Sequence, residues 1–360
     1  MVRFSCFACF AREDPPQPWD PHDPTDVPIP DCAYLGGLIR AIEERWEGEP
    51  LTFYVTKDLQ ELPSYGNQVV SIILNDEWFR TATYGGEVLA VLRPLTSTPW
   101  FSWRSQLPPT LASITALGNY ARIRYERALH ERDNVRLLAA RGWRHPTPEN
   151  VIDVPQGYYK QPTQPVKPYE ERSTDLFFAG SLVHDPGRGS YLRRVLKRVL
   201  GAPKRRYRLD MLHHLKAFAR GNPEVTVKTR VSGDTRALGT GDVTSYAHDM
   251  MNARIALVPR GTSPESYRLF EAWRYGCIPV CEELPPRPFY QGAPLITLRA
   301  WRELGGTLDA LFADEAKQRT LHEAGLRWWA EVCGERPTGA MVASKLRALT
   351  DRPSMSLTQP

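Results

Sequence analysis

The chain has 360 residues, of which 42% are hydrophobic and 24% are charged. This composition fits a folded protein of about two domains and excludes a disordered chain. The net charge of +5 is too small to indicate nucleic-acid binding by itself, and six cysteines do not make a disulfide framework. No apolar run has the length that spans a bilayer, so we expect a cytoplasmic location.

The N-terminal part of the chain predicts a tail followed by a first domain. Residues 1–32 read as an extended, proline-rich segment, because the stretch EDPPQPWDPHDPTDVPIPD cannot form a core element. Residues 33–157 alternate apolar runs with helical patterns, which indicates a parallel sheet covered on both faces. The expected elements are a helix near 35–46, strands at 51–56, 68–74 and 88–92, a long basic helix at 119–142 and a strand within 150–157.

A polar, proline-rich connector at 158–173 separates this domain from a second one at 174–335. We expect a C-terminal helix and tail at 336–360. The second domain repeats the alternation of strands and helices, so it also predicts a parallel sheet. Its expected elements are strands at 175–180 and 224–229, helices at 189–200, 207–220 and 243–252, and a strand, turn, helix and strand within 257–280.

The stretch LVPRGTSPESYRLFEAWRYGCIPV, from Leu257 to Val280, predicts a phosphate-binding unit. A turn between a strand and a helix collects backbone N–H groups and the positive end of the helix dipole. Arg268 and Glu271 are three residues apart, so they share one face of the helix. A guanidinium suits a diphosphate and a carboxylate suits ribose hydroxyls, which together indicate a nucleoside-diphosphate site.

Further donor-binding candidates lie in turns beside this helix. Ser266 precedes the helix and could cap it or meet a phosphate, while ordinary turn chemistry explains the same residues equally well. In the second domain's first strand and in a glycine-rich loop, close backbone approach to phosphate competes with a plain surface turn. The remaining candidates are Gly180, Ser181, Arg188, Arg260 and Gly261.

These residues resemble exostosin-like glycosyltransferases. The resemblance rests on Phe178-Ala179-Gly180, then Arg188, then the Pro259-x-Gly261 turn with Arg268 and Glu271, closed by GCIPV at 276–280. It covers residues 175–285 and extends, less specifically, to LNDEW at 74–78. The family implies the GT-B architecture, an α/β fold with two Rossmann-like domains facing across a cleft. It also implies a nucleotide-sugar donor, expected to be a UDP-sugar, held against Arg268 and Glu271.

The resemblance therefore predicts transfer of a sugar to an acceptor hydroxyl in bacterial glycan or glycoconjugate synthesis. No Asp-x-Asp pair is present, so we expect metal-independent chemistry in which Arg268 stabilises the leaving group. We also expect the transfer to be inverting. Asp76 and Glu77, at the end of an apolar strand, are the candidate base, with a capping or solvated pair as the alternative. Two other functions stay open, a nucleotide-sugar epimerase and a polyanion-binding protein.

The expected partners follow from the same chemistry. They are a nucleotide-sugar donor and a glycan, lipid-linked or small-molecule acceptor, with no nucleic acid and no cofactor beyond the donor itself. The basic segment 188–220 is either a solvated outer helix or a surface that meets an anionic membrane.

Overall fold

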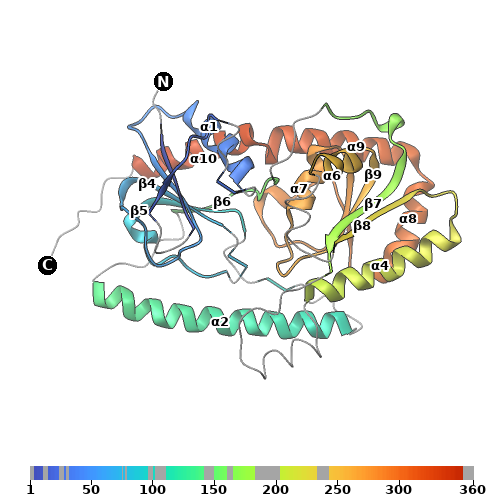
Figure 1. Cartoon of the computed structure of the whole chain (residues 1–360), viewed down its shortest axis with the longest axis horizontal. Coiled ribbons are helices and arrows are strands. Elements are labelled where there is room, and N and C mark those ends of the chain that lie inside the picture. The colour runs from blue at the N-terminus through green and yellow to red at the C-terminus, as the bar shows by residue number, and fades with distance from the viewer. Residues whose placement is uncertain are drawn as a thin grey trace. The chain divides into compact units, whose positions relative to one another are not determined.

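The computed structural model contains two compact α/β units (Figure 1). The first comprises Met1–Thr98, Arg124–Gln156 and Gly334–Pro360, and the second comprises Pro99–Ile123 and Gly157–Cys333. Each unit has its own mainly parallel sheet, which confirms the predicted α/β fold with two Rossmann-like units. The structure describes residues 4–10, 15–23, 28–29, 32–74, 76–77, 79–95, 100–101, 111–141, 150–159, 165–182, 203–232 and 243–351.

The sheet of the first unit has the order β2-β1-β3-β4-β5-β6. Its inner strands are short apolar runs buried on both faces, as the near-continuous hydrophobicity of residues 52–56 and 88–93 requires. All neighbouring strands run parallel except the edge strand β2. The strands are β1 (Ser5–Cys9), β2 (Gln17–Pro18), β3 (Thr52–Thr56), β4 (Gly66–Ile73), β5 (Val88–Arg93) and β6 (Val151–Asp153).

Helices cover one face of this sheet, and the other face is closed differently from our expectation. Helix α1 (Cys32–Glu43) packs against α10 (Glu335–Thr350), which also contacts β5. On the opposite face, loop side chains such as Leu59, Leu62 and Tyr84 fill the core with strand residues. The described parts of the β3–β4 and β4–β5 connections contain no α-helix, only the 3₁₀ turn η1 (Gly85–Glu87).

Both chain ends differ from the predicted boundaries. Strand β1 lies within the first sheet, beside β3, although residues 1–32 were expected to be an extended segment outside the domain. Five residues are too few to show a strand pattern beside a proline-rich stretch. The predicted C-terminal helix does form as α10, and it joins the first unit rather than standing apart, with Thr338 Oγ1 accepting a hydrogen bond from Tyr34 at 3.1 Å.

The sheet of the second unit has the order β11-β10-β9-β7-β8, with every neighbouring pair parallel. Alternate residues of β7 enter two separate cores: Leu176 and Phe178 on one face, Phe177 and Ala179 on the other. The strands are β7 (Thr174–Ser181), β8 (Val227–Ser232), β9 (Ala253–Val258), β10 (Ile278–Glu282) and β11 (Ile296–Leu298). Because both faces of this sheet are buried, the sequences of its strands are nearly continuous apolar runs.

Helices on both faces complete this second unit and confirm the helices predicted at 207–220 and 243–252, whereas the helix predicted at 189–200 lies outside the described residues. Helices α6 and α7 pack on one face, and α4 with α8 on the other. The helices are α4 (Pro203–Gly221), α6 (Val243–Met251), α7 (Tyr267–Arg274), α8 (Leu304–Phe312) and α9 (Glu315–Trp328), followed by the π-helix η7 (Trp329–Cys333); short 3₁₀ turns are η4 (Tyr169–Glu171), η5 (Pro288–Tyr290) and η6 (Trp301–Glu303). Helix α2 (Leu111–Arg141) contributes residues to both units.

Candidate functional site

The strand order of the second unit reverses between β7 and β9. From β7 the chain moves outward to β8, then returns to the other side of β7 to form β9, and continues outward to β10 and β11. In open parallel sheets, a crevice forms at the carboxyl ends of the strands where the order reverses, and ligands bind there. Gly180 and Ser181 are the last two residues of β7, and Arg260 and Gly261 lie in the turn after β9; the sequence pattern had indicated all four as candidates.

Helix α7 begins directly after the β9 turn. Ser266 is its N-cap, with an extended backbone, and its Oγ accepts the backbone N–H of Arg268 at 3.4 Å. The Arg268 side chain is half-buried, and its Nε has no hydrogen-bond partner among the described residues. Within that described part of the chain, no carboxylate forms an ion pair with it. Among the residues that the structure describes, Arg268 is therefore a cation at the predicted ligand edge that has no carboxylate in contact.

Glu271 lies one turn further along α7 and is only 2% exposed. Its Oε2 accepts the hydroxyl of Tyr246 at 2.6 Å, and its Oε1 accepts the backbone N–H of Tyr159 at 3.3 Å. Burial raises the pKa of the Glu271 carboxyl, while the Tyr246 hydrogen bond and the Arg268 charge oppose that rise. The sequence predicted that Glu271 and Arg268 share one face, but it gave no sign of the two tyrosines.

A second buried carboxylate, that of Glu282, binds the backbone of the Arg260–Gly261 turn. Glu282, at the end of β10, accepts the Arg260 backbone N–H at 3.0 Å and the Trp301 indole N–H at 2.6 Å. Burial raises the pKa of Glu282, against the effect of the Trp301 bond. The guanidinium of Arg260 lies 5.1 Å from the ring centre of Tyr207, and its Nε is buried without a partner in the described residues. The turn thus has a rigid support and a cationic side chain.

Gly180 and Ser181 end β7 in a tight environment. A Cβ atom at Gly180 would lie 2.7 Å from the ring of Phe178, so only glycine fits there. The carbonyl of Ser181 accepts a hydrogen bond from Arg208 Nη1 at 2.6 Å, and Arg208 is itself 3% exposed. This arginine on α4 adds positive charge at the same strand ends, whereas the sequence pattern indicated it only as part of the basic segment 188–220.

A buried ion pair anchors the loop between β9 and α7. Arg287 Nη1 lies 2.7 Å from Glu265 Oε1, and both side chains are at most 2% exposed. The hydroxyl of Tyr290 donates to the same Glu265 oxygen at 2.9 Å. Breaking such a pair leaves an uncompensated buried charge, so the loop cannot move away from the sheet at low cost. Nothing in the sequence pattern linked Glu265 to residues more than twenty positions later.

Two aromatic rings lie beside the carboxylate. The rings of Tyr159 and Tyr267 are 4.5 Å apart between centroids, and both side chains are half-buried. Tyr267 is the first residue of α7, and the Tyr159 backbone binds Glu271. An aromatic surface next to a carboxylate and a cation can hold a base, a ribose and a diphosphate in that order.

The two acidic candidates of the first unit, Asp76 and Glu77, lie in the loop after β4. Asp76 is 3% exposed, and its two oxygens lie 2.9 Å from Arg80 Nε and 2.9 Å from Arg93 Nη2. The backbone N–H of Arg80 also binds it at 2.7 Å. These contacts make Asp76 an anchor of the loop after β4, whereas Glu77 is half-buried in a turn. Arg188 lies outside the described residues.

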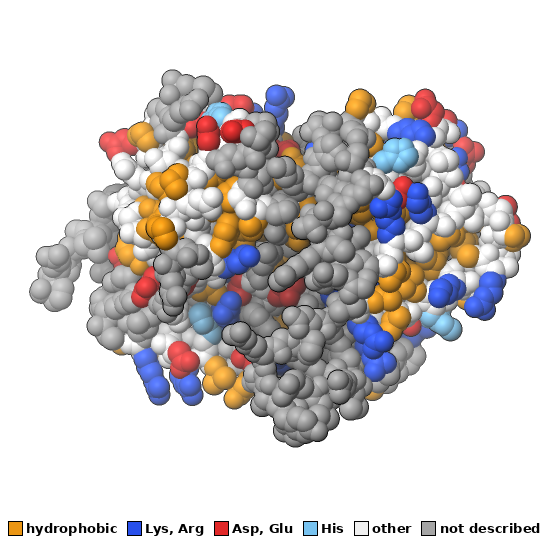
Figure 2. All heavy atoms as spheres, in the orientation of Figure 1, with side chains coloured by type: hydrophobic (Ala, Val, Ile, Leu, Met, Phe, Trp, Pro, Cys, Tyr) orange, Lys and Arg blue, Asp and Glu red, His pale blue; other side chains and the backbone are white. Residues whose placement is uncertain are grey.

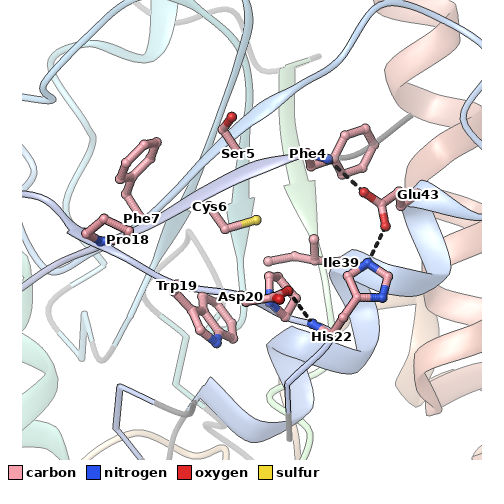
Figure 3. Close-up of a pocket in the computed structure, with 11 residues that line it drawn as sticks. Phe4, Ser5, Cys6, Phe7, Pro18, Trp19, Asp20, His22, Ile39 and Glu43 are labelled. Carbon is pink, nitrogen blue, oxygen red and sulfur yellow. Dashed lines mark hydrogen bonds and ion pairs between the residues drawn. The ribbon is translucent and has the colours of Figure 1, made fainter. Parts of the chain in front are cut away.

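A separate pocket of about 270 Å³ opens in the first unit, at the start of β1 (Figure 3). Glu43 points toward its edge, where it accepts the Phe4 backbone N–H at 2.7 Å and lies 2.5 Å from His22 Nε2. The pocket is lined by Phe4, Ser5, Cys6, Phe7, Pro18, Trp19, Asp20, Pro21, His22, Ile39 and Glu43. Burial raises the pKa of the Cys6 thiol to about 12, so the thiol stays neutral. None of the predicted site residues lines this pocket.

Comparisons with known proteins give low similarities. No protein-family model and no curated protein matches the chain. Among solved structures, the GtfA/B complex is similar at 12% identity, with a TM-score of 0.41 over 80% of this chain and 58% of that one. A UDP-N-acetylglucosamine 2-epimerase from Listeria monocytogenes, described as putative, is similar at 9% identity, with a TM-score of 0.43 over 98% and 99%. WaaG, a glycosyltransferase involved in lipopolysaccharide biosynthesis, is similar at 11% identity, with a TM-score of 0.40 over 89% and 97%.

Proposed function

We propose that this protein transfers a sugar from a nucleoside-diphosphate sugar to an acceptor hydroxyl. The observation that carries the proposal is Arg268, a half-buried cation without an ion pair among the described residues, one helical turn before the buried Glu271. Cleavage of a sugar–diphosphate bond builds negative charge on the leaving group, and preorganised cations lower the energy of that transition state. The resemblance of residues 175–285 to exostosin-like glycosyltransferases points the same way.

In this proposal the donor binds along the carboxyl edge of the second sheet. The diphosphate lies against Arg268 and the Arg260–Gly261 turn, the ribose hydroxyls meet Glu271, and the base stacks on Tyr159 or Tyr267. Because arginines supply the positive charge, we propose that the reaction needs no metal. We also propose that it is inverting. The donor is a UDP-sugar, and the acceptor is a glycan, lipid-linked or small molecule. Asp76, Glu77, Gly180, Ser181, Arg188 and Ser266 stay predicted contributors.

Titration calorimetry with UDP, GDP and inorganic pyrophosphate tests the donor site. We expect wild type to bind a nucleoside diphosphate and Arg268→Met to bind it roughly ten- to a hundredfold more weakly, since a charged hydrogen bond is lost. Arg327→Met is the matched control, because this exposed arginine on α9 pairs with the exposed Glu323. Tyr267→Leu should weaken UDP but leave pyrophosphate unchanged, since only UDP has a base to stack.

Two results would contradict this assignment. The first is the absence of nucleotide binding by wild type, and the second is equal binding by wild type and Arg268→Met. Incubation of UDP-sugars with and without acceptor sugars then separates transfer from epimerisation: transfer consumes donor only when an acceptor is present, whereas an epimerase converts the donor alone. A chelator should leave the transfer rate unchanged.

A further inference from the structure

The long helix α2 exposes several large apolar side chains. Its inner positions Ala116, Tyr120, Ile123, His130 and Asn134 follow a spacing of three and four and pack inward. Two of these inner residues are polar: His130 Nε2 lies 2.9 Å from the carbonyl of Thr81, and Asn134 Nδ2 donates to the same carbonyl. An ordinary surface helix places its polar residues on the opposite, outer face.

The outer face of α2 instead combines large apolar side chains with arginine. Ile114, Leu117, Tyr125 and Val135 are 56%, 42%, 59% and 51% exposed. Between them lie small residues, three exposed arginines and Asp133, which pairs with Arg132. Glu131, beside this face, has a side chain that is 42% exposed and pairs with Arg127. The face consists of Ile114, Leu117, Gly118, Ala121, Arg124, Tyr125, Ala128, Arg132, Asp133, Val135, Arg136 and Ala139. Figure 2 shows basic, acidic and hydrophobic side chains close together at the lower left, where the left part of α2 runs in Figure 1.

We infer that this outer face of α2 binds an anionic lipid surface. From Ile114 to Arg136 it extends about 33 Å, enough to lie along a membrane rather than touch it at a point. Leucine, isoleucine and tyrosine suit the boundary between headgroups and acyl chains, while arginines reach the phosphates. Contiguous exposed apolar surface of this kind marks a binding face. In the described part of the chain no helix is long and apolar enough to cross a bilayer, so the contact is peripheral.

Charge decides between a lipid surface and a second copy of this chain. Symmetric pairing would bring two copies of this face together, each with Arg124, Arg132 and Arg136 against one exposed acid, so two net positive surfaces would meet. Like charges facing one another across an interface oppose association. An anionic membrane removes that repulsion and attracts each arginine instead. The inference does not depend on the proposed transfer reaction, because α2 contributes none of the residues of the donor site.

Vesicle sedimentation of the full-length protein tests this inference. Wild type should bind vesicles of phosphatidylcholine mixed with phosphatidylglycerol, and bind pure phosphatidylcholine weakly. Arg124→Gln with Arg136→Gln should weaken the binding about fivefold for each arginine removed. Leu117→Gln with Tyr125→Gln should weaken it roughly tenfold through lost apolar contact. The control, Arg205→Gln with Lys216→Gln on exposed positions of α4, makes the same charge change elsewhere and should bind as wild type does.

Because the altered side chains are exposed, all variants should melt at the wild-type temperature, so lost binding cannot come from misfolding. Failure of wild type to sediment with anionic vesicles would overturn the inference. So would equal binding by wild type and both α2 variants. Analytical ultracentrifugation tests whether the face instead binds a second copy. If wild type is a dimer and the double variant Leu117→Gln with Tyr125→Gln is a monomer, the face belongs to a dimer interface and the lipid surface is rejected.

Discussion

At the scale of single residues, the second unit is organised around buried polar side chains that each have a defined task. Glu271 accepts hydrogen bonds from the Tyr246 hydroxyl and from the Tyr159 backbone N–H, and Glu282 accepts one from the backbone N–H of Arg260 in the turn after β9. His322 joins a helix to a turn in the same way: its Nδ1–H donates to the carbonyl of Gly276 at 2.6 Å. A buried group of this kind is costly to leave unpaired, so each one fixes a unique local arrangement.

The stability of the protein should depend on pH through His322. Burial lowers the pKa of this imidazole below about 6.5, and the nearby Arg172 charge adds to the effect, while Glu170 and Glu323 oppose it. The unfolded state therefore binds more protons, so the contribution is complete above about pH 6.5 and decreases as pH falls, by at most about 1.4 kcal/mol per pH unit. His322→Asn keeps a donor for Gly276 but cannot titrate.

Urea unfolding of both proteins at several pH values between about 5.5 and about 7.5 measures this contribution. The difference in unfolding free energy between wild type and His322→Asn should shrink as pH falls. A difference that stays constant over this range would show that His322 is not held neutral by burial.

At the scale of elements, the end of α7 illustrates how a turn couples backbone conformation to packing. The helix stops because Gly276, two residues after Arg274, adopts a left-handed conformation with φ of 72°. A Cβ at this position would also lie 2.7 Å from His322 Cε1 and 3.0 Å from Arg172 Nη2. Two independent constraints therefore require glycine at the start of the turn into β10.

Gly276→Ala should lower the free energy of unfolding by about 2–5 kcal/mol, from backbone strain together with displacement of His322. Gly292→Ala is the matched control: Gly292 has a nearly identical φ of 74°, but a Cβ there meets nothing within 4 Å. Gly292→Ala should therefore lower the free energy of unfolding through backbone strain alone, by about 1–2 kcal/mol. Equal losses in denaturant unfolding would mean that the contact with His322 contributes nothing.

At the scale of the whole molecule, the chain passes between its two units more than once. It leaves the first unit after Gln156 and returns to it at Gly334, directly after the π-helix η7. Residues near these two points of the chain lie close together: the ring centroids of Tyr158 and Trp329 are 5.9 Å apart. The C-terminal helix α10 then completes the core of the unit with which the sequence began.

Gly339→Ala tests this membership of α10. A Cβ at residue 339 would lie 2.5 Å from the Ala41 Cβ and 2.8 Å from the Ala41 backbone, so the variant should push α10 away from α1 at a cost of about 1–3 kcal/mol. Hydrogen exchange should accelerate in β3, β4 and β5 and stay unchanged in β7 and β9. Gly306→Ala in α8, where a Cβ meets nothing within 4 Å, should instead stabilise by about 0.5–1 kcal/mol.

If the strands of both units responded equally to Gly339→Ala, α10 would not belong specifically to the first unit.

The sequence by itself determined the features that local pattern encodes. Buried strands such as β5 and β7 read as apolar runs, and a three-residue spacing put Arg268 and Glu271 on one face of a helix capped by Ser266. These follow from backbone periodicity and capping, which depend only on neighbouring residues.

Only the tertiary structure decided which distant residues meet. It brought Tyr159 to Glu271 across 112 positions and Thr338 to Tyr34 across 304, and it bound Asp76 between two arginines. It also placed β1 inside the first sheet and left an apolar face of α2 exposed. Periodicity shows that a residue is buried, but the partner that satisfies a buried polar group is chosen by the packing of whole elements, which no local spacing records.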